Sequence, residues 1–149
     1  MAKPADKRLL VSLSGLFNFI EDIMAHAGQI RVLIADDHTM VRQALRNALQ
    51  AFPNIDVVGE AGDGDEAVAA TAKLQPEVVV MDVNMAKMDG ITATRLIKAQ
   101  HQEIAVIGLS VDLKDYQFHA LKNAGASVVL SKENAALYDL YGAIQQAAA

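Results

Sequence analysis

The chain has 149 residues, of which 52% are hydrophobic and 21% charged, with a formal net charge of −5 and no cysteine. This length and composition favour one ordered globular domain with a short appendage, because two full domains need a longer chain. The acidic balance argues against a basic nucleic-acid surface or a polybasic membrane patch. The lack of cysteine excludes disulfides, thiol nucleophiles and zinc thiolates, and it fits a location in the reducing cytoplasm.

Residues 1–29 are predicted to form an N-terminal extension. Basic residues precede the apolar segment LLVSLSGLFNFI, and AHA follows at residues 25–27, which is the outline of a signal peptide. Polar side chains interrupt the apolar segment, and Glu21 and Asp22 precede the AHA, so a secretion signal is the less favoured interpretation. No segment has the roughly 20 consecutive apolar residues that a membrane-spanning helix requires.

Within this extension, residues 9–27 are predicted to form an amphipathic helix. Apolar residues recur three and four positions apart, as they do along one face of a helix. They are Leu9, Leu13, Leu16, Ile20, Ile23 and Ala27. The stripe either packs on the chain's own domain or pairs two chains as a short coiled coil, and we favour a homodimer. The segment AHAGQ is the predicted hinge.

From residue 30 to residue 149, strand and helix patterns alternate five times. The predicted strands are apolar almost throughout, as parallel strands covered on both faces are. They span residues 30–36, 55–61, 77–82, 104–110 and 127–131. The predicted helices span residues 38–51, 64–74, 89–100, 112–124 and 133–147. This order predicts an α/β fold with a doubly wound, five-stranded parallel sheet.

Charged and hydroxyl side chains follow four of these strands. Asp36 and Asp37 end the first, Asp82 the third and Ser110 the fourth, and Lys132 follows the fifth. All of them fall at the carboxyl edge of the sheet, where ligands usually bind in such folds. Converging carboxylates repel one another unless positive charge neutralises them, and oxygen ligands at a loop edge with no histidine or cysteine interleaved suit Mg²⁺. We therefore predict a magnesium site with a lysine beside it.

Asp82 is the candidate nucleophile of this site. One of its oxygens can bind a metal while the other attacks an electrophile, and carboxylates do form phosphoryl intermediates. Phosphoryl transfer needs a metal, a cationic side chain and hydroxyl or backbone donors around the phosphoryl oxygens. Lys132 and Ser110 have these properties, so the pattern predicts a phosphate-accepting aspartate.

These motifs resemble the receiver domain of two-component response regulators, a flavodoxin-like fold, over residues 30–147. The resemblance rests on the DD after the first strand, VVVMDVNMAKMDG around the third, Ser110 after the fourth and VVLSK at the fifth. The segments IADDHTMVRQALRNAL and VVGEAGDGDEAV are most similar to receivers of the NarL/LuxR type, which usually precede a helix-turn-helix output domain. On this basis, residues 30–149 are expected to be the receiver domain.

The resemblance implies a metal site that holds Mg²⁺. Its ligands would be the side chains of Asp36, Asp37 and Asp82 and the backbone carbonyl of Asn84. An isolated aspartate at a strand end is more often a cap or a turn residue. Several matching positions in the same order favour the functional interpretation here.

The resemblance also implies a phosphorylation cycle. Asp82 would take a phosphoryl group from a sensor histidine kinase or a histidine phosphotransfer protein and would lose it by self-catalysed hydrolysis. Lys132 would pair with the acyl phosphate, and Ser110 would move to hydrogen-bond it. Such a protein is a self-modifying phosphoacceptor rather than a conventional enzyme. It signals through changed protein contacts, including dimerisation.

The chain departs from the receiver pattern at three positions. Val129 stands where receivers commonly have Tyr or Phe, Ala86 replaces a proline after the phosphoacceptor, and Glu133 follows the lysine in place of the frequent proline. The usual aromatic switch is therefore not expected. A pseudo-receiver that dimerises without phosphorylation is the alternative hypothesis, and a small-substrate phosphatase is a weaker one.

The residues after Lys132 are accounted for by the last predicted helix. We therefore expect no DNA-binding output domain in this chain and no direct contact with nucleic acid. Two further features are given structural interpretations. Residues 59–67, GEAGDGDEA, are expected to be a solvated turn and a helix start, and His38 is expected to have a capping or surface role.

Overall fold

The computed structural model describes residues 13–21, 28–111, 114–133 and 136–149. Residues 13–21 are helical and exposed, within the predicted span of 9–27, whose remaining residues lie outside the described part. In the part of the chain that the structure describes, no helix is long and apolar enough to cross a membrane.

Five strands form one parallel sheet in the order β2-β1-β3-β4-β5. Their bounds are β1 Ile30–Ala35, β2 Ile55–Ala61, β3 Val78–Asp82, β4 Ala105–Ser110 and β5 Val128–Ser131. Each predicted strand is present, with ends shifted by at most one residue. The central strands β1, β3 and β4 are apolar because helices cover both of their faces. The predicted doubly wound α/β fold is confirmed.

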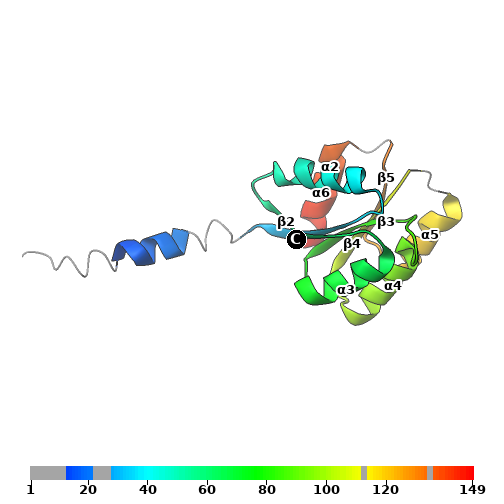
Figure 1. Ribbon diagram of the computed structural model, residues 1–149, viewed down its shortest axis with the longest axis horizontal. Helices are drawn as coiled ribbons and strands as arrows, with labels where there is room; N and C mark the ends of the chain where they lie inside the picture. The colour runs from blue at the N-terminus through cyan, green and yellow to red at the C-terminus, as the bar shows by residue number, and fades with distance from the viewer. Residues whose placement is uncertain (1–12, 22–27, 112–113, 134–135) are drawn as a thin grey trace, which may run out of the picture.

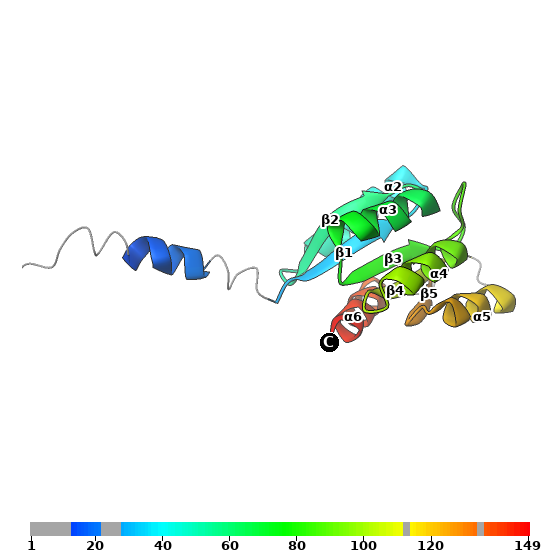
Figure 2. The same ribbon diagram turned by 90° about the horizontal axis from the view of Figure 1, so that it is seen from below.

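Helices follow each strand and cover the sheet on both sides (Figures 1 and 2). Their bounds are α2 Thr39–Gln50, α3 Gly64–Leu74, α4 Gly90–Gln100, α5 Asp115–Ala124 and α6 Leu137–Ala148. Helices α2 and α6 lie on one face, and α3, α4 and α5 lie on the other. Leu33 and Val79 pack toward α3 and α4, whereas Ile34 and Val80 pack toward α2 and α6, so alternate residues of each strand fill two cores.

Helix α6 begins at Leu137, four residues later than predicted. The Asp139 carboxylate accepts a hydrogen bond from the backbone N–H of Ala136 at 2.9 Å, which satisfies a donor at the start of the helix. Asp89 and Asp63 cap α4 and α3 in the more common way, by accepting from backbone N–H groups at 2.7 and 2.8 Å.

Residues 59–67 do contain the start of α3, but the expectation of a solvated turn was wrong. Ala61, Asp63 and Gly64 are buried. A Cβ atom on Gly64 would overlap the backbone carbonyl of Met88, in the loop that follows β3. The start of α3 therefore packs directly against the segment that follows Asp82.

Candidate functional site

The site lies at the carboxyl edge of the sheet, where β1, β3 and β5 end. Asp36 and Asp82 are almost completely buried, with 1% and 4% of their surface exposed. Lys132 follows β5, and its Nζ lies 2.5 Å from Asp36 Oδ2 and 3.3 Å from Asp82 Oδ2. Three residues from distant parts of the chain are thus held in direct contact, as the strand order predicts.

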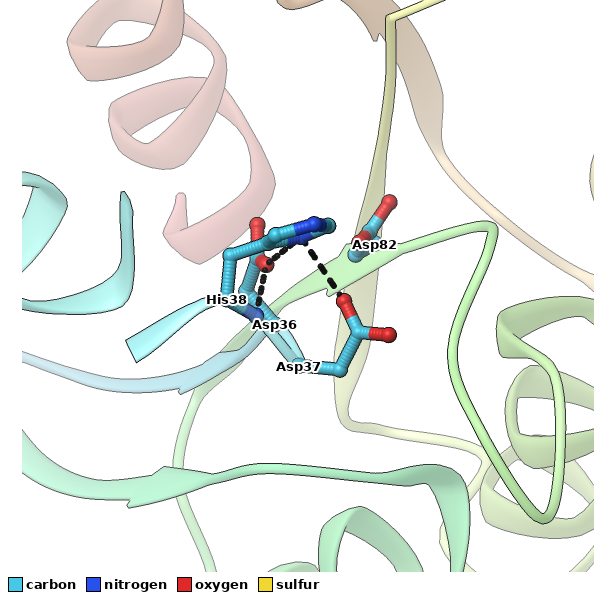
Figure 3. A group of neighbouring side chains, drawn as sticks. All are labelled: Asp36, Asp37, His38 and Asp82. Atoms are coloured by element: carbon cyan, nitrogen blue, oxygen red, sulfur yellow. Dashed lines mark hydrogen bonds and ion pairs between the residues drawn. The ribbon is translucent and has the colours of Figure 1, made fainter. Parts of the chain in front are cut away.

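Asp37 and His38 complete the cluster from the outside (Figure 3). One carboxylate oxygen from each of Asp36, Asp37 and Asp82 and one nitrogen of His38 lie within 4.8 Å of one another. His38 Nδ1 lies 2.9 Å from Asp37 Oδ1 and 3.4 Å from Asp36 Oδ1. His38 occupies the N-cap position of α2 without a side-chain cap bond, so the imidazole belongs to the rim of the site.

The charges of this cluster do not balance. Among the described residues, three carboxylates face one ammonium, that of Lys132, and the His38 side chain is 71% exposed. Burial raises the pKa of the Asp82 carboxyl above its ordinary value, Lys132 opposes this effect and the Asp36 charge adds to it. A divalent cation relieves such a cost, and oxygens of carboxylates are the ligands that Mg²⁺ prefers. The residues therefore fit a magnesium ion.

Ser110 ends β4, one residue beyond Leu109, the partner of Asp82 in the pairing of β3 and β4, and is fully buried. Among the described residues, none forms a hydrogen bond with its Oγ, whereas its backbone carbonyl accepts from the Lys132 N–H at 2.8 Å. A buried hydroxyl without a partner costs free energy. Ser110 thus offers an unused donor at the edge of the site.

Asn84 is in the loop after β3. Its backbone N–H donates to Asp82 Oδ1 at 3.3 Å, and its side-chain Oδ1 accepts from Gln117 Nε2 of α5 at 3.4 Å. The orientation of the Asn84 backbone carbonyl toward a metal stays a prediction. The contact with Gln117 was not predicted, because it depends on how α5 packs.

Two further residues near the site were not anticipated. Lys87 has a positive φ of 65°, which is uncommon for a non-glycine residue, and its Nζ lies 3.4 Å from Asp63 Oδ2. The hydrogen bond from the Glu66 backbone lowers the pKa of Asp63, and Lys87 adds to that effect. This ion pair ties the loop after Asp82 to the start of α3.

Sequence comparison relates the chain to response regulators. The family described as the response regulator receiver domain matches residues 32–145. The transcriptional regulatory protein LiaR of Bacillus subtilis is 42% identical over 107 residues, which are 72% of this chain and 51% of LiaR. The transcriptional regulatory protein DegU of Brevibacillus brevis is 38% identical over 106 residues, which are 70% of this chain and 44% of DegU. The chain thus spans about half the length of these curated relatives or less.

Solved structures agree with the sequence match. The response regulator domain of Thermotoga maritima CheB has a TM-score of 0.75 at 30% identity, over 80% of this chain and 96% of that one. A LuxR-family response regulator from Aurantimonas has a TM-score of 0.75 at 29% identity, over 79% and 84% of the two chains. The predicted similarity to receivers of the NarL/LuxR type is confirmed, and the chain belongs to the response regulator receiver family of two-component signal transduction.

Proposed function

We propose that the chain is an active receiver in which Asp82 accepts a phosphoryl group in a Mg²⁺-dependent reaction. The observation that carries this proposal is the contact of Lys132 with two buried carboxylates beside the partly exposed Asp37. A buried carboxylate is costly unless a positive charge neutralises it, and this site has more acids than bases. That excess is what a metal-dependent phosphoryl acceptor requires.

In this proposal, the Asp82 carboxylate attacks the phosphorus of a phosphohistidine on a kinase or phosphotransfer protein. The P–N bond breaks, the electron pair leaves with the imidazole, and an acyl phosphate forms on Asp82. Asp36, Asp37, Asp82 and the backbone carbonyl of Asn84 would hold the metal, which neutralises charge on the phosphoryl oxygens when bound. Lys132 Nζ would move from the carboxylates to a phosphoryl oxygen.

Ser110 would report the modification. Its hydroxyl, which has no hydrogen-bond partner among the described residues, would donate to a phosphoryl oxygen, and this would draw the end of β4 toward Asp82. Val129 is partly buried against the cluster of Val83, Leu121 and Ala126, so this route replaces the usual aromatic switch. Hydrolysis ends the signal when water attacks the phosphorus, the bond to Asp82 breaks and the carboxylate returns.

The first test is phosphorylation by a small donor. We expect acetyl phosphate with Mg²⁺ to add one phosphoryl group to the intact protein, as read by mass spectrometry. Asp82→Asn and removal of Mg²⁺ by a chelator should each abolish the adduct.

Asp56→Asn is the matched control, because Asp56 lies on the same sheet in β2 without a contact to the site among the described residues. It should leave the adduct unchanged. An unmodified wild-type protein that also fails to bind Mg²⁺ would favour the pseudo-receiver instead.

We further propose that residues 1–29 are an extension whose helix, at 9–27, pairs two chains. Leu13, Leu16, Phe17 and Ile20 are exposed and spaced as one helical face. A helix as short as residues 13–21 is marginal in water without packing, so the stripe needs a surface to cover it. A second copy of the same stripe supplies one.

Sedimentation of the full chain tests this pairing. We expect a dimer whose dissociation constant rises at least about tenfold in the double variant Leu16→Ala with Ile20→Ala, because apolar area leaves the interface. Asn18→Ala, on the same exposed helix, is the matched control and should dissociate like the wild type. A full chain that stays monomeric at every concentration would contradict the dimer.

A further inference from the structure

Arg42 reaches from α2 back to the end of β1. Its Nη1 donates to the backbone carbonyl oxygen of Asp36 at 2.7 Å, and only 18% of its side chain is exposed. That carbonyl belongs to the peptide group that joins Asp36 to Asp37. A hydrogen bond to this carbonyl holds the planar unit that contains the Cα atoms of both aspartates, and so restrains the backbone from which both carboxylates extend.

Glu60 holds the Arg42 side chain in place. Its Oε1 lies 3.3 Å from Arg42 Nε, and its Oε2 accepts from Arg46 Nη1 at 2.6 Å. Glu60 is in β2, directly beside Ile34 of β1, so the arrangement joins α2, β1 and β2 at one point. The Arg42 guanidinium thus contacts the Glu60 carboxylate through Nε and donates to the Asp36 carbonyl through Nη1.

The remaining polar groups of Asp36 are also engaged. Its N–H donates to the Ala61 carbonyl at 3.0 Å, Oδ1 accepts from the His38 N–H at 2.9 Å, and Oδ2 contacts Lys132. The Arg42 bond to the carbonyl completes this set. Asp36 is therefore held at every polar atom, as a preorganised ligand is.

We propose that Arg42 is a positioning residue that sets the Mg²⁺ affinity of the site by fixing the Asp36–Asp37 peptide. This inference rests on the proposed metal site. Two effects of Arg42 oppose each other, because its positive charge repels a cation while its hydrogen bond orders the ligands. Glu60 neutralises the positive charge of Arg42 at 3.3 Å. The ordering of the metal ligands therefore dominates the effect of Arg42 on Mg²⁺ affinity.

The test is a Mg²⁺ titration of the full chain that is monitored by two-dimensional ¹H–¹⁵N NMR, which reports binding and folding together. Loss of a residue that supports a metal ligand typically weakens binding 10–100-fold, so we expect the dissociation constant of Arg42→Met to rise about tenfold. Arg46→Met is the matched control, since it loses the same Glu60 partner without a contact to Asp36. Its dissociation constant should stay within about twofold of the wild type.

Glu60→Gln provides a second, milder variant that keeps the Arg42 donor. We expect it to weaken Mg²⁺ binding less than Arg42→Met does and to add nothing further in the Arg42→Met background, because both changes act through one hydrogen bond. Equal effects of Arg42→Met and Arg46→Met, tighter binding in Arg42→Met, or additive effects of Glu60→Gln would each overturn the inference. A wild-type protein that does not bind Mg²⁺ would overturn the metal site itself, which the same titration reads separately.

Discussion

Replacing Lys132 with methionine should lower the free energy of unfolding of the metal-free protein by about 3 kcal/mol at neutral pH, the lower end of the range for removing one partner of a buried ion pair. The variant leaves the buried carboxylates of Asp36 and Asp82 facing each other without a cation. Urea unfolding measures the difference. Lys73→Met, an exposed lysine at the end of α3, should change the value by less than about 0.5 kcal/mol.

This loss of stability should depend on pH. Burial already raises the pKa of Asp82, and removal of Lys132 takes away the charge that opposes the rise. The pKa of Asp82 in the folded variant then lies further above its pKa in the unfolded chain. The difference in free energy of unfolding therefore has its full value above the folded pKa and shrinks as the pH falls through it. A stability difference that grows toward acidic pH would contradict this account of the site.

Gly90→Ala should lower the free energy of unfolding and disturb the site. Gly90 begins α4, and a Cβ atom there would overlap the carbonyl oxygen of Asp82, a backbone atom that cannot rotate away. Overpacking of this kind costs about 2 kcal/mol, and the forced shift occurs at Asp82, the proposed phosphoacceptor. We therefore expect a lower free energy of unfolding together with slower phosphorylation by acetyl phosphate.

Gly142→Ala is the control for this change. Gly142 lies in α6, and a Cβ atom there would have no described neighbour within 4 Å. Alanine favours a helix over glycine by about 1 kcal/mol, so this variant should be as stable as the wild type or more stable. Equal destabilisation by Gly90→Ala and Gly142→Ala would show that the contact with Asp82 does not limit the size of residue 90.

The fold was predictable because the signal of each strand is strong and local. Segments such as VVVMD are buried on both faces, and alternation with helical patterns leaves a parallel sheet as the natural arrangement. The grouping of Asp36, Asp82 and Lys132 followed from that topology, since carboxyl ends of parallel strands share one edge.

The contacts that support the site were not predictable in the same way. The long side chain of Arg42 donates to the backbone of Asp36, six residues earlier in the chain. Lys87 forms an ion pair with Asp63, which lies in a different loop. Both contacts depend on side-chain rotamers and loop geometry, which the periodicity of hydrophobic residues does not predict. The start of α6 was predicted too early for a related reason, because the hydrogen bond of the Asp139 side chain to the Ala136 N–H in its first turn also depends on a side-chain rotamer.

The position of the phosphoryl group decides whether Asp82 is the phosphoacceptor. After reaction with acetyl phosphate and Mg²⁺, borohydride reduction converts an aspartyl phosphate to homoserine, which fragmentation of the peptides assigns to one residue. We expect homoserine at position 82 in the wild-type protein and at no position in the Asp82→Asn variant. Homoserine at Asp36 or Asp37, or none in a wild-type protein that binds Mg²⁺, would contradict Asp82 as the phosphoacceptor.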